Sequence, residues 1–179
     1  MRICSNLERH EAELLASMVG SLVELLTERE SSAPNDELAQ LTGIRTGHHS
    51  APSDLTLGRL LPDFHRPDQE RDLGAEMING DLNSALRSIN EPKIIDAKLG
   101  AARTVLDSLP PGGGDIALTE AQALQWLTAL NDVRLALGAM LGISEDTPDH
   151  LPADHPNAAH LDVYHWLTVM QELLVEVLM

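Results

Sequence analysis

Two stretches of this chain begin with a capping-box sequence and continue with apolar residues at helical spacing. The sequence SNLE (residues 5–8) has the S-x-x-E form, and leucine and methionine side chains follow it every three or four positions. The sequence TEAQ (residues 119–122) has the equivalent T-x-x-Q form and precedes a second apolar stretch. These patterns predict helices over about residues 6–29 and 119–141.

Apolar spacing and helix start and stop signals predict the other helices of the chain, of which the one over residues 68–90 is polar and acidic. We expect them over about residues 36–41, 53–61, 68–90, 92–109 and 157–178. Pro92 would lie in the first turn of its helix, where a proline costs little, and the preceding helix could break at Asn79-Gly80. The sequence PPGGGD (residues 110–115) then separates the helices, and the DIALT segment that follows it is long enough for only a brief strand.

The residues RIC near the N-terminus are the candidate partner of that strand. The chain is therefore predicted to be an all-α bundle of about six helices, with at most one very short two-stranded β-ribbon. Its 179 residues suffice for one domain with a core. We expect a single helical domain over residues 1–179, with an acidic linker at 144–157 before the last helix.

Aromatic side chains are scarce, and this limits how a core can be built. The aromatic residues are Phe64, Trp126, Tyr164 and Trp166. The core must therefore consist of leucine, alanine, valine, isoleucine and methionine, a set that favours helices over strands.

The formal net charge of −16 is concentrated toward the C-terminus. Residues 104–179 contain Arg134 as their only Lys or Arg, against eleven Asp and Glu. Such a region repels phosphates, and the one locally basic stretch, residues 87–103, also contains Glu91 and Asp96. Direct binding to nucleic acid without a partner is disfavoured. A protein partner with a basic surface is expected instead.

Cys4 is the single cysteine, which excludes an intramolecular disulfide and a cysteine-based zinc cluster. The first twenty residues carry charges where a signal peptide needs an apolar region, and no apolar run is long enough to span a bilayer. We therefore expect a cytoplasmic protein that does not enter a membrane.

The candidate site residues are polar residues on otherwise apolar helix faces. Asn131 and Arg134 fall among the leucines of the predicted helix 119–141, so both are expected to be largely buried. Asp132 projects from the opposite side of that helix and is not expected to pair with Arg134. Lys98 lies among apolar residues in the same way on its own helix. A buried arginine keeps its charge and needs a carboxylate or several carbonyl partners.

The last predicted helix contributes three more residues to this set. They are Tyr164, Trp166 and Gln171. Two interpretations stay open: a buried polar network that fixes helix register, or a pocket around Arg134, Lys98 and Asn131 that binds a carboxylate or phosphate.

Four histidines recur at every fifth position of the acidic linker and the last helix. They are His150, His155, His160 and His165. Metal-binding helical pairs use a spacing of four, because residues four apart share a face, whereas a spacing of five does not. We therefore reject a metal site. Docking that depends on pH is a better hypothesis for this run, since imidazole titrates near neutral pH.

Two sequences resemble the signature stretches of an actinobacterial family of uncharacterised proteins. They are WLTALNDVRLALGAMLGI (residues 126–143) and YHWLTVMQELL (residues 164–174), and the sequences LERHEAELLASMVGSLVELL and LLPDFHR fit the same family more loosely. The resemblance implies a regulator of transcription, associated with the oxidative-stress response, that acts through protein partners. It implies no enzymatic activity and no catalytic residue. With Cys4 as its only thiol, a thiol switch in this chain would have to be intermolecular or a simple oxidation.

Nothing in the sequence predicts an enzyme, because no paired nucleophile and base, phosphate-binding loop or carboxylate pair is recognisable. No cofactor is expected. The leading hypothesis is a cytoplasmic regulatory protein that acts through protein contacts, with a homodimer as one form. The alternative is a helical module that binds a small anion at Arg134, Lys98 and Asn131.

Overall fold

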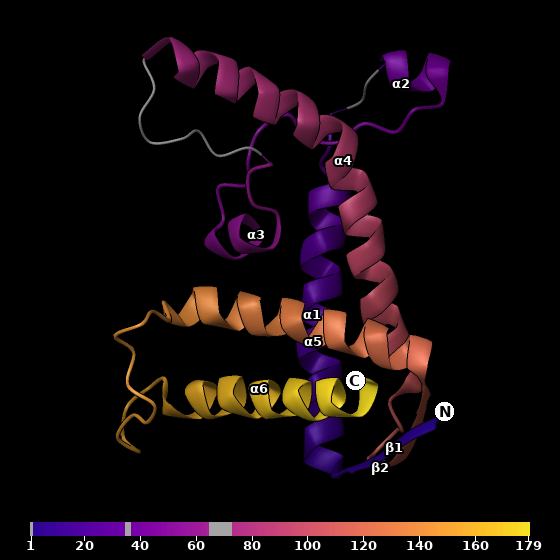
Figure 1. Cartoon of the computed structure of the whole chain (residues 1–179), viewed down its shortest axis with the longest axis vertical. Helices are drawn as coiled ribbons and strands as arrows, with labels where there is room; N and C mark the ends of the chain where they lie inside the picture. The colour runs from indigo at the N-terminus through magenta and orange to yellow at the C-terminus, as the bar shows by residue number, and fades with distance from the viewer. Residues whose placement is uncertain (1, 35–36, 65–72) are drawn as a thin grey trace. The chain divides into compact units, whose positions relative to one another are not determined.

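The computed structural model describes residues 2–34, 37–64 and 73–179, and helices dominate these ranges (Figure 1). Within them lie six helices and one two-stranded antiparallel sheet. The elements in chain order are β1 (Arg2–Leu7), α1 (Arg9–Ser31), α2 (Glu37–Thr42), α3 (Leu55–Leu60), α4 (Leu73–Ser108), β2 (Gly114–Thr119), α5 (Glu120–Leu141) and α6 (Ala158–Leu178). The prediction of a mostly helical protein with a short β-ribbon is confirmed. The predicted starts at residues 36 and 68 lie outside the described residues.

The chain divides into two compact units, and the division falls within the long helices α1 and α4. Unit 1 comprises Met1–Glu24 and Lys98–Met179, and unit 2 comprises Leu25–Ala97. The expectation of one helical domain stays a prediction. The candidate site lies within unit 1.

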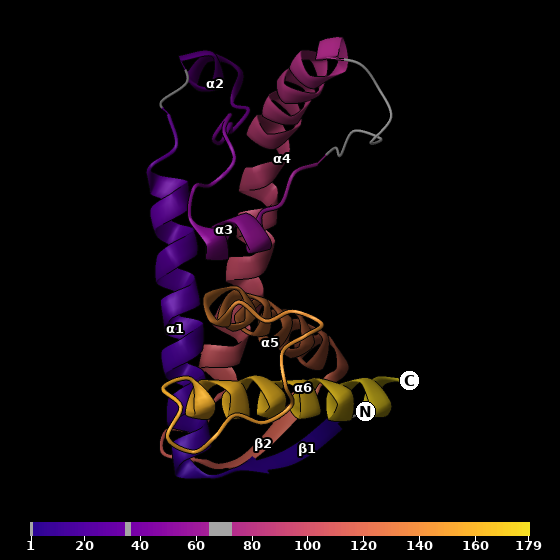
Figure 2. The same cartoon turned by 90° about the vertical axis from the view of Figure 1, so that its left-hand side faces the viewer.

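The β-ribbon of unit 1 pairs the two segments that the sequence suggested. Strand β1 runs antiparallel to β2, with Ile3 opposite Leu118 and Leu7 opposite Gly114. Ile3, Leu7 and Leu118 are buried, whereas Cys4 is exposed. The ribbon thus has one apolar face, as the side-chain alternation of a strand requires, and it runs beside α6 (Figure 2).

The first predicted capping box is wrong. Ser5 and Asn6 belong to β1, and the helix begins at Arg9. The helix start is instead closed by Glu11, whose carboxylate accepts a hydrogen bond from the Glu8 amide at 2.8 Å. The physical reason is the pairing partner: β2 offers backbone hydrogen bonds along the whole of residues 2–7, and Asn6 also donates to Asp115 at 2.7 Å.

The PPGGGD sequence allows the chain to pass close to the start of α1. Gly113 has a φ of +85°, and a Cβ atom built on it would lie 2.6 Å from the backbone nitrogen of Arg9. Only glycine tolerates both this backbone conformation and this approach. The segment is a connection into β2, as the sequence indicated.

Helix α5 follows its sequence signals at both ends. The Thr119 hydroxyl accepts from the Gln122 amide at 3.2 Å, and the Gln122 side chain accepts from the Thr119 amide at 2.9 Å. Gly142, with a φ of +63°, ends the helix. Helix α6 returns beside α5 in the opposite direction (Figure 1). The predicted capping box and both final helices are confirmed.

Helix α4 corrects the prediction of two helices separated near residue 91. It is continuous over 36 residues, with Pro92 inside it and no break at Gly80. A proline in a helix interior leaves the carbonyl four residues earlier without its donor. Here that carbonyl, on Ser88, accepts a hydrogen bond from the Gly47 amide at 2.7 Å. Gly47 therefore supplies the bond that Pro92 cannot make, and the helix continues.

Unit 2 contains a buried ion-pair network that no sequence pattern indicated. Glu91 is 1% exposed and accepts hydrogen bonds from Arg87 Nη1 and from Arg29 Nε, each at 2.8 Å. Arg87 also donates to Asp63 at 2.9 Å and to the Leu61 carbonyl at 3.0 Å. Arg87 belongs to the basic stretch 87–103, but its charge is matched inside the protein by Glu91 and Asp63.

Candidate functional site

The predicted polar site on α5 assembles only in part. Arg134 donates to Thr168 at 3.4 Å and to Asn131 at 3.5 Å, and its guanidinium lies 5.7 Å from the centre of the Tyr164 ring. Its Nε atom is buried without a hydrogen-bond partner among the described residues. Asn131, Arg134 and Tyr164 are therefore brought together across α5 and α6.

Asn131 and Arg134 are both half-buried and the Nε atom of Arg134 is fully buried, in agreement with the expectation that most of each side chain is shielded from water. At about 100° per residue the leucines of α5 lie within less than half of its circumference, and the same side of the helix includes Asn131 and Arg134. Trp126, which is 1% exposed, marks the face that packs, whereas Leu124 is 49% exposed. The packed face is thus rotated away from the one that the leucine spacing predicted.

Lys98 lies with Asp132 and not with Arg134. Its ammonium nitrogen is 2.6 Å from a carboxylate oxygen of Asp132, which is 2% exposed. Burial raises the pKa of the Asp132 carboxyl, while the hydrogen bond and charge of Lys98 act in the opposite direction. The positive charge of Lys98 is therefore already matched.

The three candidate residues of the last helix have different surroundings. Tyr164 contacts Arg134 and lies close to Gly138, where an added Cβ would be 3.2 Å from the ring. Gln171 is half-buried. Trp166 belongs to another feature, the cavity described below.

Two of the four spaced histidines contact each other, and the other two do not join them. The rings of His150 and His165 contact each other edge-on, with centroids 6.5 Å apart, whereas His155 and His160 are exposed. Across the described ranges, no group of three or more His, Cys, Asp or Glu side chains is arranged to hold a metal ion.

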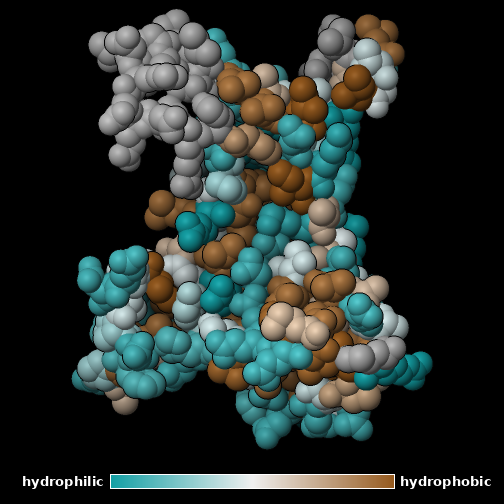
Figure 3. Space-filling view, viewed as in Figure 1, coloured by the Kyte–Doolittle hydropathy of each residue, from teal (hydrophilic) through white to brown (hydrophobic). Residues whose placement is uncertain are grey.

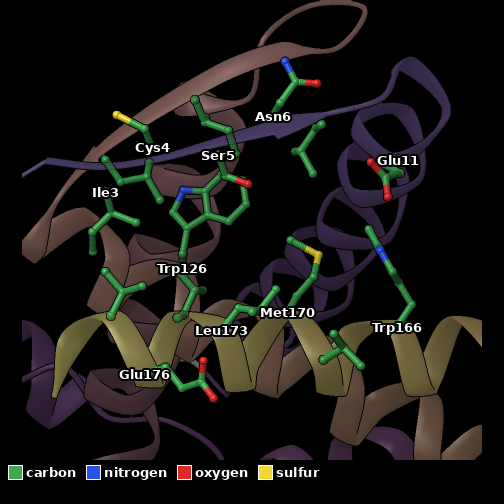
Figure 4. A pocket seen from close by; sticks show the side chains of 16 residues that line it. Ile3, Cys4, Ser5, Asn6, Glu11, Trp126, Trp166, Met170, Leu173 and Glu176 are labelled. Atoms are coloured by element: carbon green, nitrogen blue, oxygen red, sulfur yellow. The ribbon is translucent and has the colours of Figure 1, made fainter.

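A second candidate site is a cavity of about 400 Å³ in unit 1 that no sequence pattern predicted (Figure 4). We call it the α6 cavity. It is bounded by the β-ribbon on one side and α6 on the other, with Trp126 of α5 between them. Its lining residues are Ile3, Cys4, Ser5, Asn6, Leu7, Glu11, Ile116, Leu118, Trp126, Trp166, Val169, Met170, Leu173, Leu174, Glu176 and Val177.

The α6 cavity has a buried apolar base and an exposed apolar rim. Ribbon residues such as Ile3 and Leu118 are at most 8% exposed. On α6, by contrast, Val169 is 51% exposed, Leu173 57% and Val177 43%. These three residues are four positions apart and so form one stripe along the helix. Hydrophobic side chains are grouped on the α5–α6 pair in the space-filling view (Figure 3).

The charges of the α6 cavity are all of one sign. Glu11 and Glu176 are the charged members of its described lining, which contains no lysine, arginine or histidine. Unit 1 as a whole has five Lys and Arg against fifteen Asp and Glu. Of these cations, Lys98 pairs with Asp132 and Arg9 with Glu13. The apolar opening therefore lies in a strongly acidic unit.

One sequence signal could have indicated this cavity. Apolar residues on α6 occupy more of its circumference than one buried stripe requires, since Trp166, Met170 and Leu174 form a second row beside the exposed one. The spacing of these α6 residues contains no information on the position of the β-ribbon, which forms the opposite wall of the cavity.

Comparisons with known proteins give consistent results. The family model described as Domain of unknown function (DUF2017) matches residues 2–178. Proteins named oxidative stress regulator AosR from Mycobacterium tuberculosis and Mycobacterium bovis are each 53% identical over 180 residues, covering 99% of this chain and 83% of theirs. A Mycobacterium leprae relative, named "Putative oxidative stress regulator AosR", is 52% identical over 172 residues, covering 95% of this chain and 79% of its own length.

No solved structure matches the chain. Over the described ranges, every helix is too short or too polar to cross a membrane.

Proposed function

The chain belongs to the DUF2017 family, and on this premise we propose that it is a non-enzymatic cytoplasmic regulator of the oxidative-stress response that acts by binding another protein at the α6 cavity. The names of the mycobacterial relatives support a regulatory role. The resemblance noted in the sequence supports the same role.

The exposed stripe on α6 is the observation that carries this proposal. Val169, Leu173 and Val177 present apolar surface to water beside a cavity that is already apolar. Complete burial of such a side chain contributes about 1.5 to 3 kcal/mol. A grouped apolar surface next to a cavity is typical of a protein interaction site.

The charge distribution supports a protein partner over DNA. Unit 1 is acidic, and two cations of the basic stretch 87–103 are engaged, Arg87 with Glu91 and Lys98 with Asp132. Phosphate binding needs free Lys and Arg side chains. An effect on transcription would therefore pass through the bound protein.

One observation favours the anion-binding alternative. The Nε atom of Arg134 is buried and unpaired among the described residues, and Asn131 lies beside its guanidinium. Lys98 does not add a second free charge, because Asp132 neutralises it. Calorimetry with phosphate and with a dicarboxylate tests this alternative, and binding that is lost in Arg134→Met would support it.

The test of the main proposal is cross-linking at the cavity in cells exposed to an oxidant. Leu173→p-benzoylphenylalanine places a photoreactive group on the exposed stripe, and the same change at Met140, 72% exposed on α5 and outside the cavity lining, is the control. We expect a specific adduct from position 173 and none from position 140.

A genetic readout complements the cross-link. Leu173→Glu should reduce the induction of oxidant-responsive genes, whereas Met140→Glu should leave it unchanged. Normal induction in Leu173→Glu, with the protein present at its usual level, would contradict a role for the cavity.

A further inference from the structure

We propose that the occupant of the α6 cavity is a basic amphipathic helix of the partner protein. This inference rests on the proposed function and adds to it the chemistry of the bound segment. Its apolar face would cover the exposed stripe of α6, and its Lys and Arg residues would lie against the acidic rim.

The geometry of the exposed stripe on α6 indicates that the bound segment of the partner is a helix. Val169, Leu173 and Val177 follow one another at intervals of four residues, so they form a ridge on the helix surface. Such a ridge packs into the groove between two rows of side chains on another helix. Trp166, Met170 and Leu174, which also line the cavity, form the adjacent row. An incoming helix would therefore contact two parallel rows on α6.

The charge of the rim indicates that the incoming helix is basic. Glu11 lies on α1 and Glu176 on α6, so the described lining carries acidic charge from two of its elements. No Lys or Arg follows Arg134 in the sequence, and the last helix contains Asp162, Glu172 and Glu176. Complementary charge favours fast association with a basic segment and disfavours an acidic one.

The same charges argue against a second copy of this chain as the occupant. Two copies related by a two-fold axis would present the same surface to each other. The glutamates of one rim would then face those of the other. Unit 1, with five Lys and Arg against fifteen Asp and Glu, offers few cations to offset them. Like charges held close together weaken association.

The chain carries its own reporter for this binding. Trp126 and Trp166 are its only tryptophans, and both line the α6 cavity. Trp126 is 1% exposed and Trp166 is half-buried. A helix bound across the rim would exclude water from Trp166, so its fluorescence emission should move to shorter wavelength. The Trp166→Phe variant should lose this change and still bind the peptide in calorimetry.

The experiment titrates the full chain with three synthetic peptides of about 18 residues, long enough to form a helix. The first has leucines at helical spacing and lysines on the flanking positions. The second replaces each lysine by glutamate, and the third is the first peptide with two of its central residues replaced by proline. We expect the first to bind and the other two to bind at least about tenfold more weakly.

Matched variants locate the binding. Leu173→Glu and Glu176→Lys should each weaken binding of the basic peptide by about tenfold or more. Met140→Glu and Glu172→Lys are the controls, since Met140 and Glu172 are exposed but outside the cavity lining, and they should bind as the unchanged protein does. Equal binding by all four variants would mean general attraction to an acidic protein and would overturn the proposal.

Other outcomes separate this inference from the proposed function. If the acidic or the proline-containing peptide binds as tightly as the basic peptide, the proposal that the occupant is a basic helix is overturned. If the cross-link from position 173 is nonetheless found, the protein contact remains and only the identity of the occupant is wrong. If analytical sedimentation shows a dimer that Leu173→Glu abolishes, the occupant of the α6 cavity is a second copy of this chain and the proposed partner helix is wrong. If the cross-link is absent but the basic peptide binds and Leu173→Glu abolishes that binding, the preference of the cavity for a basic helix is supported. The proposed function, contact with a regulatory partner in cells, is then overturned.

Discussion

The ammonium nitrogen of Lys98 lies 2.6 Å from a carboxylate oxygen of Asp132, which is 2% exposed in the core of unit 1. The second carboxylate oxygen has no hydrogen-bond partner among the described residues. This pair joins α4 to α5. It also removes Lys98 from the cations that a ligand could use.

Asp132 should make stability depend on pH. Burial raises the pKa of its carboxyl above the ordinary value of 3.8, so the folded protein binds this proton more tightly than the unfolded chain. This difference contributes fully to the free energy of unfolding at pH values below the pKa that Asp132 has in the unfolded chain. The contribution is lost as pH rises through the pKa that Asp132 has in the folded protein.

Asp132→Asn should therefore flatten the decrease in unfolding free energy above about pH 4. Urea unfolding at several pH values measures this, with Asp162→Asn, an exposed change on α6, as the control. Parallel pH profiles for the unchanged protein and Asp132→Asn would contradict the assignment.

Lys98→Met should destabilise unit 1 at neutral pH. The change leaves the Asp132 carboxylate buried without its cation, and breaking a buried pair in this way costs about 3 to 5 kcal/mol. Lys93→Met, an exposed change on the same helix, should cost much less. Chemical unfolding compares the two. A similar small loss in both variants would show that the pair contributes little.

Glu91→Gln should destabilise unit 2 by about 3 to 5 kcal/mol, because it removes the anion shared by two guanidinium groups. Arg87, 1% exposed, would keep Asp63 as its remaining carboxylate partner. Glu28→Gln, an exposed change on α1, is the matched control. Thermal unfolding followed by circular dichroism gives the comparison, and equal melting temperatures would refute the role of the network.

Gly47→Ala should destabilise the middle of α4. A Cβ atom at residue 47 would lie 3.0 Å from Cδ and Cγ of Pro92, which is too close, and moving away would stretch the bond to the Ser88 carbonyl. We expect a loss of about 1 to 3 kcal/mol. Gly80→Ala, in the same helix with no atom within 4 Å of the added Cβ, should instead stabilise the protein by about 0.5 to 1 kcal/mol. Hydrogen exchange of α4 amides and chemical unfolding test both changes, and stabilisation by both would contradict the packing.

Much of the helical content was predictable because it depends on neighbours in the chain. The capping box of Thr119 and Gln122 and the glycine at 142 act over four residues or fewer, and α5 begins and ends where they indicate. The expected pairing of RIC with DIALT is also confirmed, because strand composition and the glycines between helices marked the second strand.

The candidate site was less predictable, for reasons visible in particular residues. Arg134 contacts Asn131 and Tyr164, but the face of α5 that packs includes Trp126, 1% exposed, and not Leu124, 49% exposed, so the leucines did not mark it. Lys98 was grouped with Arg134, yet Asp132 holds it from the other side of α5. Helix periodicity describes one helix at a time and contains no information on which face a neighbour will cover.

The sequence by itself determined that this chain is mostly helical and acidic, with α5 and α6 as its most apolar helices, because composition and spacing of a few residues decide such properties. Only the tertiary structure decided that Ser5 belongs to a strand, that α4 continues through Pro92, and that α6 faces a cavity. Each of these depends on groups far apart in the chain: β2 for Ser5, the Gly47 amide for the Ser88 carbonyl, and the ribbon for α6. Hydrogen bonds and packing at such separations form only when the chain folds, so the local pattern cannot contain them.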